Sequence, residues 1–135
     1  MREIKFRGKT KALSEWVVGS LIIDKERTWI SVQKEHWNMG TFDNIEVVPE
    51  SVGQYTGLKD ENGREIYDGD IIKVWITKTI NFVAMVDCLN GAFGIGSIPS
   101  GYGYHHKFSS FHNNVGTRYE VIGNAYENKE LLEEK

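Results

Sequence analysis

Glycine most constrains what this chain can fold into, because fourteen glycines are spread along 135 residues that hold only two prolines. The segments between the glycines are rich in β-branched and aromatic residues, which favour strands because they fit a pleated, half-buried surface. Frequent turn residues between such segments are typical of short strands. The sequence therefore predicts a mainly β fold. Its length is that of one ordinary domain, so we expect residues 1–135 to form a single domain.

Three residue pairs predict tight turns between strands. Asn62-Gly63 and Asp68-Gly69 tolerate positive φ, so each predicts a turn in the middle of the chain. Gly19-Ser20 separates two apolar segments and predicts a two-residue hairpin connection. Near the C-terminus, Asn128 predicts the cap of a short helix, which has too few residues to be stable unless it docks on the protein.

Residues 70–77 and 82–89 form the two strongest predicted strands, and each carries apolar side chains on both faces. Apolar residues on both faces mean that both faces are covered. The cover comes either from the rest of the chain or from a second copy, and the two alternatives have equal weight, since exposed apolar patches on monomers are small. The face that a second copy would cover consists of Ile71, Trp75, Val83 and Met85.

The composition excludes several classes of protein. No apolar segment approaches the roughly 20 residues of a membrane helix, and the N-terminus lacks the apolar stretch of a signal peptide, so we expect a soluble protein of the cytoplasm. The single cysteine, Cys88, excludes an internal disulfide or a cysteine-based zinc cluster and suits a reducing compartment. Its neighbours are apolar, which predicts a buried and unreactive thiol.

No catalytic, cofactor or metal site is predicted. The acidic residues in the middle of the chain do not match the spacing of a calcium-binding loop, and turn formation explains the three aspartates among them better. These residues are Asp60, Glu61, Glu65, Asp68 and Asp70. A second cluster consists of His36, His105, His106 and His112. Adjacent residues on a strand point to opposite faces, so a surface loop is preferred there over a metal or hydrolytic site.

The first eleven residues are basic and offer the best argument for nucleic-acid binding. The cations of this segment are Arg2, Lys5, Arg7, Lys9 and Lys11, against a single acidic residue. Such a stripe could contact phosphates while bases stack on a tryptophan, of which Trp16, Trp29 and Trp37 are the candidates. A solvated strand face is the preferred reading, because the whole chain has a net charge of −3.

Three blocks of the sequence form a recognisable pattern. They are REIKFR at residues 2–7, GQYTGLKD and NGREIYDGDIIK at residues 53–60 and 62–73, and YEVIGN and YEN at residues 119–124 and 126–128. Together they resemble the YopX family of phage and prophage proteins. This resemblance implies a β-rich fold with a small SH3-like barrel, additional strands and no established enzymatic activity. It carries over no functional residue.

Three functions follow from these observations. The first is a non-enzymatic interaction module of a phage or prophage, which associates with itself and could also bind a host or phage protein. The second is a nucleic-acid binder that uses the basic N-terminal strand. The third is a small hydrolase or metal enzyme built on three histidines and a turn with two aspartates: His105, His106, His112, Asp68 and Asp70.

Overall fold

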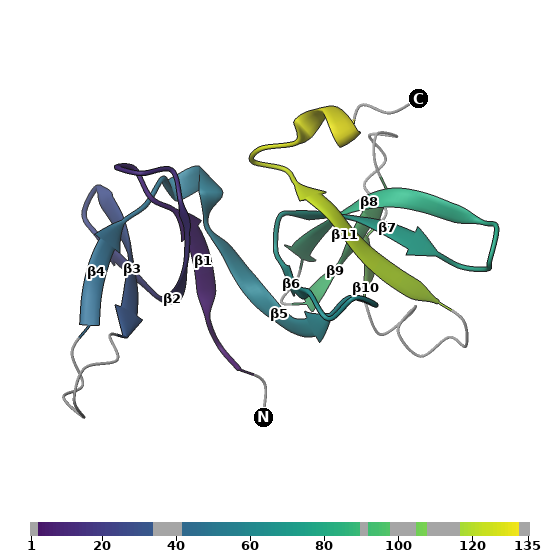
Figure 1. The fold of residues 1–135 in the computed structure, drawn as a ribbon, viewed down its shortest axis with the longest axis horizontal. Coiled ribbons are helices and arrows are strands. Elements are labelled where there is room, and N and C mark those ends of the chain that lie inside the picture. The colour runs from purple at the N-terminus through teal and green to yellow at the C-terminus, as the bar shows by residue number, and fades with distance from the viewer. Residues whose placement is uncertain (1–2, 34–41, 90–91, 98–104, 108–116, 133–135) are drawn as a thin grey trace. The chain divides into compact units, whose positions relative to one another are not determined.

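The computed structural model describes residues 3–33, 42–89, 92–97, 105–107 and 117–132. The chain divides into two compact units, Met1–Tyr55 and Thr56–Lys135. Antiparallel strands make up most of both units (Figure 1), so the mainly β fold is confirmed. The single domain over residues 1–135 stays a prediction.

The first unit is built on a sheet in which neighbouring strands follow the order β4-β3-β2-β1-β5. Their bounds are β1 (Phe6–Lys9), β2 (Trp16–Asp24), β3 (Arg27–Gln33), β4 (Phe42–Glu46) and β5 (Gly53–Lys59). A 3-10 turn, η1 (Pro49–Ser51), connects β4 to β5. The exposure of the side chains alternates along most of β2. Its less exposed residues face the same side of the sheet as Ile30 and Val47, which are fully buried.

The hairpin predicted at Gly19-Ser20 is wrong, because β2 runs through this pair without a turn. Gly19 pairs with Phe6 of β1, whereas Ser20 pairs with Ser31 of β3. A Cβ at Gly19 would collide with the carbonyl oxygen of Ser31. Glycine is therefore required here for the close approach of two backbones, and the chain reverses later, between Asp24 and its partner Arg27.

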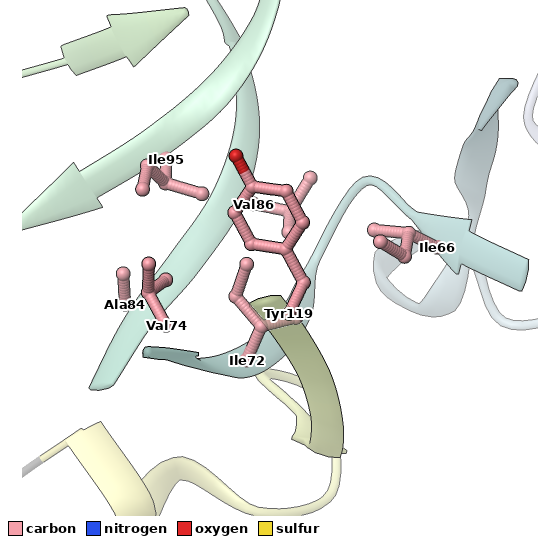
Figure 2. Packing of buried hydrophobic residues seen from close by; sticks show 7 residues of the cluster. All are labelled: Ile66, Ile72, Val74, Ala84, Val86, Ile95 and Tyr119. Atoms are coloured by element: carbon pink, nitrogen blue, oxygen red, sulfur yellow. The ribbon is translucent and has the colours of Figure 1, made fainter. Parts of the chain in front are cut away.

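The second unit holds a sheet with the strand order β10-β9-β8-β7-β11. Its strands are β7 (Asp70–Trp75), β8 (Asn81–Leu89), β9 (Ala92–Ser97), β10 (His105–Lys107) and β11 (Arg118–Asn124), and β6 (Glu65–Tyr67) pairs with β5. Alternate residues of these strands form its core (Figure 2): Ile66, Ile72, Val74, Ala84, Val86, Ile95 and Tyr119. Burying each of the larger aliphatic side chains stabilises the fold by about 1.5–3 kcal/mol.

The two turns predicted in the middle of the chain are confirmed. Gly63 has a φ of 84°, and its N–H donates to the carbonyl oxygen of Asp60 at 3.0 Å. Gly69 has a φ of 93°, and its N–H donates to the carbonyl oxygen of Val86 at 2.8 Å. These turns set the start of β6 and of β7, and so align the two strands with the core.

The C-terminal segment covers part of the outer face of β7. Ile71 is fully buried and pairs with Gly123 of β11. A Cβ at Gly123 would lie 2.9 Å from Leu131 Cδ1, so Leu131 packs directly over this position. Of the two alternatives for covering this face, the chain itself covers Ile71.

The predicted C-terminal helix is not confirmed as an α-helix. The structure has a four-residue 3-10 turn, η2 (Lys129–Leu132), in which the Leu131 N–H donates to the Asn128 carbonyl oxygen at 2.9 Å. The Asn128 side chain accepts from the Asn124 N–H at 3.1 Å, so it bonds backward to the strand and does not cap the turn. An SH3-like barrel is also not confirmed, since no strand pairing closes either sheet among the described residues.

Candidate functional site

The basic residues of β1 lie on the outer face of the first sheet. Gly8 points inward, because a Cβ on it would lie 2.9 Å from Val47 Cγ2 in the core. Successive residues of a strand point to opposite faces, so Arg7 and Lys9 point outward. Two of the five predicted cations, Arg7 and Lys9, thus lie on the outer face of β1, and Lys5 directly precedes the strand.

Trp16 lies beneath two of these cations. It is the first residue of β2 and pairs directly with Lys9 of β1. The Arg7 guanidinium carbon lies 5.0 Å from the Trp16 ring centroid, and the Lys9 ammonium lies 5.7 Å from it. Contacts of this kind stabilise a fold by about 0.5–1 kcal/mol when they are exposed. We name Arg7, Lys9 and Trp16 the basic-aromatic face.

Lys5 extends the basic-aromatic face toward β5. Its ammonium lies 4.9 Å from the ring centroid of Tyr55 and 3.3 Å from Glu3 Oε1. The Tyr55 N–H donates to the Lys5 carbonyl oxygen at 2.9 Å, which fixes the two residues side by side. No local pattern in the sequence points to Tyr55, because the pairing of β1 with β5 brings together residues fifty positions apart.

The other two predicted cations do not join this face. Lys11 Nζ forms an ion pair with Glu46 Oε2 at 3.1 Å, so its charge is offset by a carboxylate of β4. Arg2 lies outside the described residues.

The same outer face continues along β2 to a second tryptophan. Val18 and Ile22 are 41% and 37% exposed, and they share the face with Trp16 because they follow it at even spacing. Ile22 pairs with Trp29 of β3, and the guanidinium carbon of Arg27 lies 6.0 Å from the Trp29 ring centroid. Of the three tryptophans predicted for stacking, Trp37 lies outside the described residues.

Charge is divided unequally between the two units. Residues 1–55 hold eight Lys and Arg against eight Asp and Glu, so the net charge of −3 belongs entirely to residues 56–135. A net negative charge repels an anionic ligand, and this repulsion therefore comes from the second unit more than from the first.

The predicted self-association face is only partly available on the surface. Ile71 is buried inside the protomer, whereas Trp75, Val83 and Met85 are half-buried. The ring of Trp75 lies between two cations, with Lys73 Nζ at 5.1 Å and the Arg118 guanidinium carbon at 5.2 Å from its centroid.

Two acidic residues of the middle block, Asp60 and Asp70, accept hydrogen bonds from backbone N–H groups of the turns. Asp60 Oδ1 accepts from the N–H groups of Asn62 and Arg64 at 2.9 and 2.8 Å. Asp70 Oδ2 accepts from the Tyr67 N–H at 2.7 Å, in a residue that is 1% exposed. No group of three or more His, Cys, Asp or Glu that could hold a metal ion occurs among the described residues.

The histidine cluster lies mostly outside the described residues, which include neither His36 nor His112. The backbone of His105 and His106 belongs to β10, where they pair with Gly96 and Ile95. The hydrolase or metal enzyme built on these histidines stays a prediction.

The thiol predicted to be buried is exposed instead. Cys88 shares the parity of Ala84 and Val86, which are fully buried, but it lies near the end of β8, where the core no longer covers the strand.

Within the described residues, neither helical segment is long and apolar enough to cross a bilayer.

Comparison with known proteins places this architecture in a family. No curated protein matches the chain. The chain is similar in fold to the crystal structure of protein EF1440 from Enterococcus faecalis, with a TM-score of 0.56 and 24% sequence identity over 98% of this chain and 99% of that one. The model of the YopX protein family matches residues 5–133, a range that includes β1, the Asp60 and Asp70 turns, β11 and η2, and the chain therefore belongs to the YopX family.

Proposed function

We propose that this protein is a non-enzymatic binding module that binds nucleic acid through the basic-aromatic face. The observation that carries the proposal is that Arg7 and Lys9 both lie over the ring of Trp16, at 5.0 and 5.7 Å. Each nucleotide has a flat base and an anionic phosphate. A half-buried tryptophan with two cations beside it offers a stacking partner and a phosphate contact in one place.

The strand that carries these residues suits this role because its other face is anchored in the core. Gly8 lies against Val47, which is fully buried, so the backbone between Arg7 and Lys9 is held in place. A rigid strand presents its outward side chains at a fixed spacing, which reduces the entropy lost when they bind.

The proposal is tested with labelled oligonucleotides of single- and double-stranded DNA and RNA. Fluorescence anisotropy is measured at low salt, where phosphate contacts are strongest, and then repeated as salt rises. The salt slope measures the number of phosphates contacted, at about −0.7 per phosphate for single strands. We expect Lys9→Gln to reduce its magnitude by about 0.7. Arg7→Lys keeps the charge and should weaken binding without changing the slope, because lysine lacks the planar guanidinium.

The control is the double variant Lys11→Gln with Glu46→Gln, which removes an ion pair from the same unit and leaves the net charge unchanged. It should bind as the unchanged protein does. If none of the four nucleic acids binds at low salt, or if Lys9→Gln matches the control, the proposed function is wrong.

An SH3-like barrel in the first unit is the finer structural proposal. It is supported by the strand order β4-β3-β2-β1-β5, by the 3-10 turn between β4 and β5, and by the bridge between Thr10 and Val47. β2 also divides its partners, pairing with β1 through residues 16–19 and with β3 through residues 20–24. A strand shared in this way lets one sheet bend over a common core.

Self-association is the second candidate function. The protein would then act in the cytoplasm of a host that carries the phage or prophage, and it would also bind a host or phage protein there. Self-association is supported by Ile76 and Ile80, which are 40% and 58% exposed at the connection between β7 and β8. Light scattering at high micromolar concentration tests it, with Ile80→Lys as the variant. A strictly monomeric protein would contradict self-association.

A further inference from the structure

We infer that the ligand is a single strand of nucleic acid that runs over the outer face from Trp16 to Trp29. The inference rests on the proposed function and names both the class of ligand and a second stacking site. Trp29 resembles Trp16 in its surroundings, because each is half-buried and has a guanidinium near its ring, from Arg27 and Arg7 respectively.

The two tryptophans lie on one continuous face. Trp16 and Ile22 are six residues apart on β2, and Trp29 is the direct partner of Ile22 on β3. The exposed residues between them, Val18 and Ser20, have the same parity as Trp16 and Ile22. Even spacing along a strand keeps side chains on one face, so the path between the two rings stays on the outside of the sheet.

The length of this path sets the length of the ligand. At a rise of about 3.3 Å per residue, six residues of β2 extend about 20 Å. A strand stacked at the duplex spacing of about 3.4 Å per phosphate would cover this path with about six nucleotides, and an unstacked strand would cover it with fewer. This number lies within the roughly 4–16 nucleotides that small β-barrel modules cover.

The path along β2 favours a single strand of nucleic acid over a duplex, because β2 changes its pairing partner midway. β2 leaves β1 after Gly19 and joins β3 at Ser20, so the face is shared between two differently paired halves of the strand. A duplex is stiff over about 150 base pairs and presents its bases edge-on inside the grooves. A single strand bends between nucleotides and exposes flat base faces, which both tryptophans require.

The experiment measures the affinity of the full chain for oligothymidylates of increasing length, from about two to about twelve nucleotides, by fluorescence anisotropy. We expect the affinity to rise steeply up to about six nucleotides and then slowly. Trp29→Leu should weaken binding of the longer oligonucleotides by about tenfold and leave the shortest nearly unchanged, because only the longer ones reach the second ring. A duplex of equal length should bind more weakly than the single strand.

Arg27→Gln is the second variant, since Arg27 is exposed and its replacement keeps the tryptophan. Lys25→Gln is its matched control, because it removes the same charge from the same turn. Two outcomes would overturn this inference and leave the proposed function in place. In the first, Arg27→Gln and Lys25→Gln have equal effects on binding. In the second, the Trp29→Leu protein binds long oligonucleotides normally, whereas the Lys9→Gln protein does not. If Lys9→Gln leaves the affinity for every oligonucleotide unchanged, the proposed function itself is wrong.

Discussion

The carboxylate of Asp60 accepts a hydrogen bond from the backbone N–H of Val121, at 2.9 Å across 61 residues of sequence. This contact uses Oδ2, while Oδ1 accepts from the N–H groups of Asn62 and Arg64. One buried side chain therefore closes its own turn and also attaches that turn to β11. This role accounts for an aspartate at this position.

Replacing Asp60 by asparagine should destabilise the protein by about 1–3 kcal/mol. The amide keeps one oxygen for the turn but places an NH₂ group, which cannot accept, opposite the Val121 N–H. Urea unfolding measures the loss. Glu61→Gln is the control, because the Glu61 side chain forms an exposed contact with Arg118 at 3.5 Å, and such pairs contribute about 0–1 kcal/mol. Equal losses in the two variants would contradict the role given to Asp60.

Two glycines should respond very differently to alanine. Gly63→Ala places a Cβ in open space at a φ of 84°, so it costs about 1–2 kcal/mol of backbone strain. Gly19→Ala sets a Cβ against the Ser31 carbonyl oxygen, and backbone cannot move aside as a side chain can. We expect Gly19→Ala to cost about 3 kcal/mol or more. Thermal unfolding of both variants checks the order, which a more stable Gly19→Ala protein would reverse.

Alkaline unfolding should depend on Tyr119. Burial raises the pKa of its phenol from 10.0 to about 12. Below pH 10 the phenol is neutral in both states, whereas between pH 10 and 12 it ionises in the unfolded chain but keeps its proton in the folded one. Stability is therefore present below pH 10 and falls by up to about 1.4 kcal/mol per pH unit as pH rises toward 12.

Tyr119→Phe should remove this part of the alkaline slope in urea unfolding measured from pH 9 to 11. Tyr126→Phe is the matched control, because Tyr126 is 40% exposed and lies outside the core. It should unfold with the slope of the unchanged protein. A Tyr119→Phe protein that loses stability as steeply as the control would rule out Tyr119 as the group responsible.

Local signals in the sequence predicted local features of the fold. Asn62-Gly63 and Asp68-Gly69 were predicted as turns because their residues tolerate positive φ, and both glycines have it. The hairpin predicted at Gly19-Ser20 was wrong because the sequence does not distinguish a glycine that permits a turn from one that permits close packing of two strands. Cys88 failed because alternation predicts which face a residue takes, while the extent of the core along that face depends on distant strands.

The candidate site was predicted in part. The basic stripe of the first eleven residues predicted a charged strand face that includes Arg7 and Lys9, and the structure has both over Trp16. The ion pair of Lys11 with Glu46 depends on how β4 returns to the end of β1, which no local pattern encodes. The contact of Lys5 with Tyr55 depends in the same way on the pairing of β1 with β5.

The two units should unfold together, as the prediction of a single domain requires. β5 (Gly53–Lys59) crosses the boundary between the two units, and it pairs with β1 near its start and with β6. In the variant Trp75→Phe all remaining tryptophans lie in residues 1–55, so their fluorescence reports on the first unit alone. We expect its urea midpoint to coincide with that of circular dichroism, which reports on all strands, as two-state unfolding demands. Two separate midpoints would instead mean that the chain consists of two domains that share a strand.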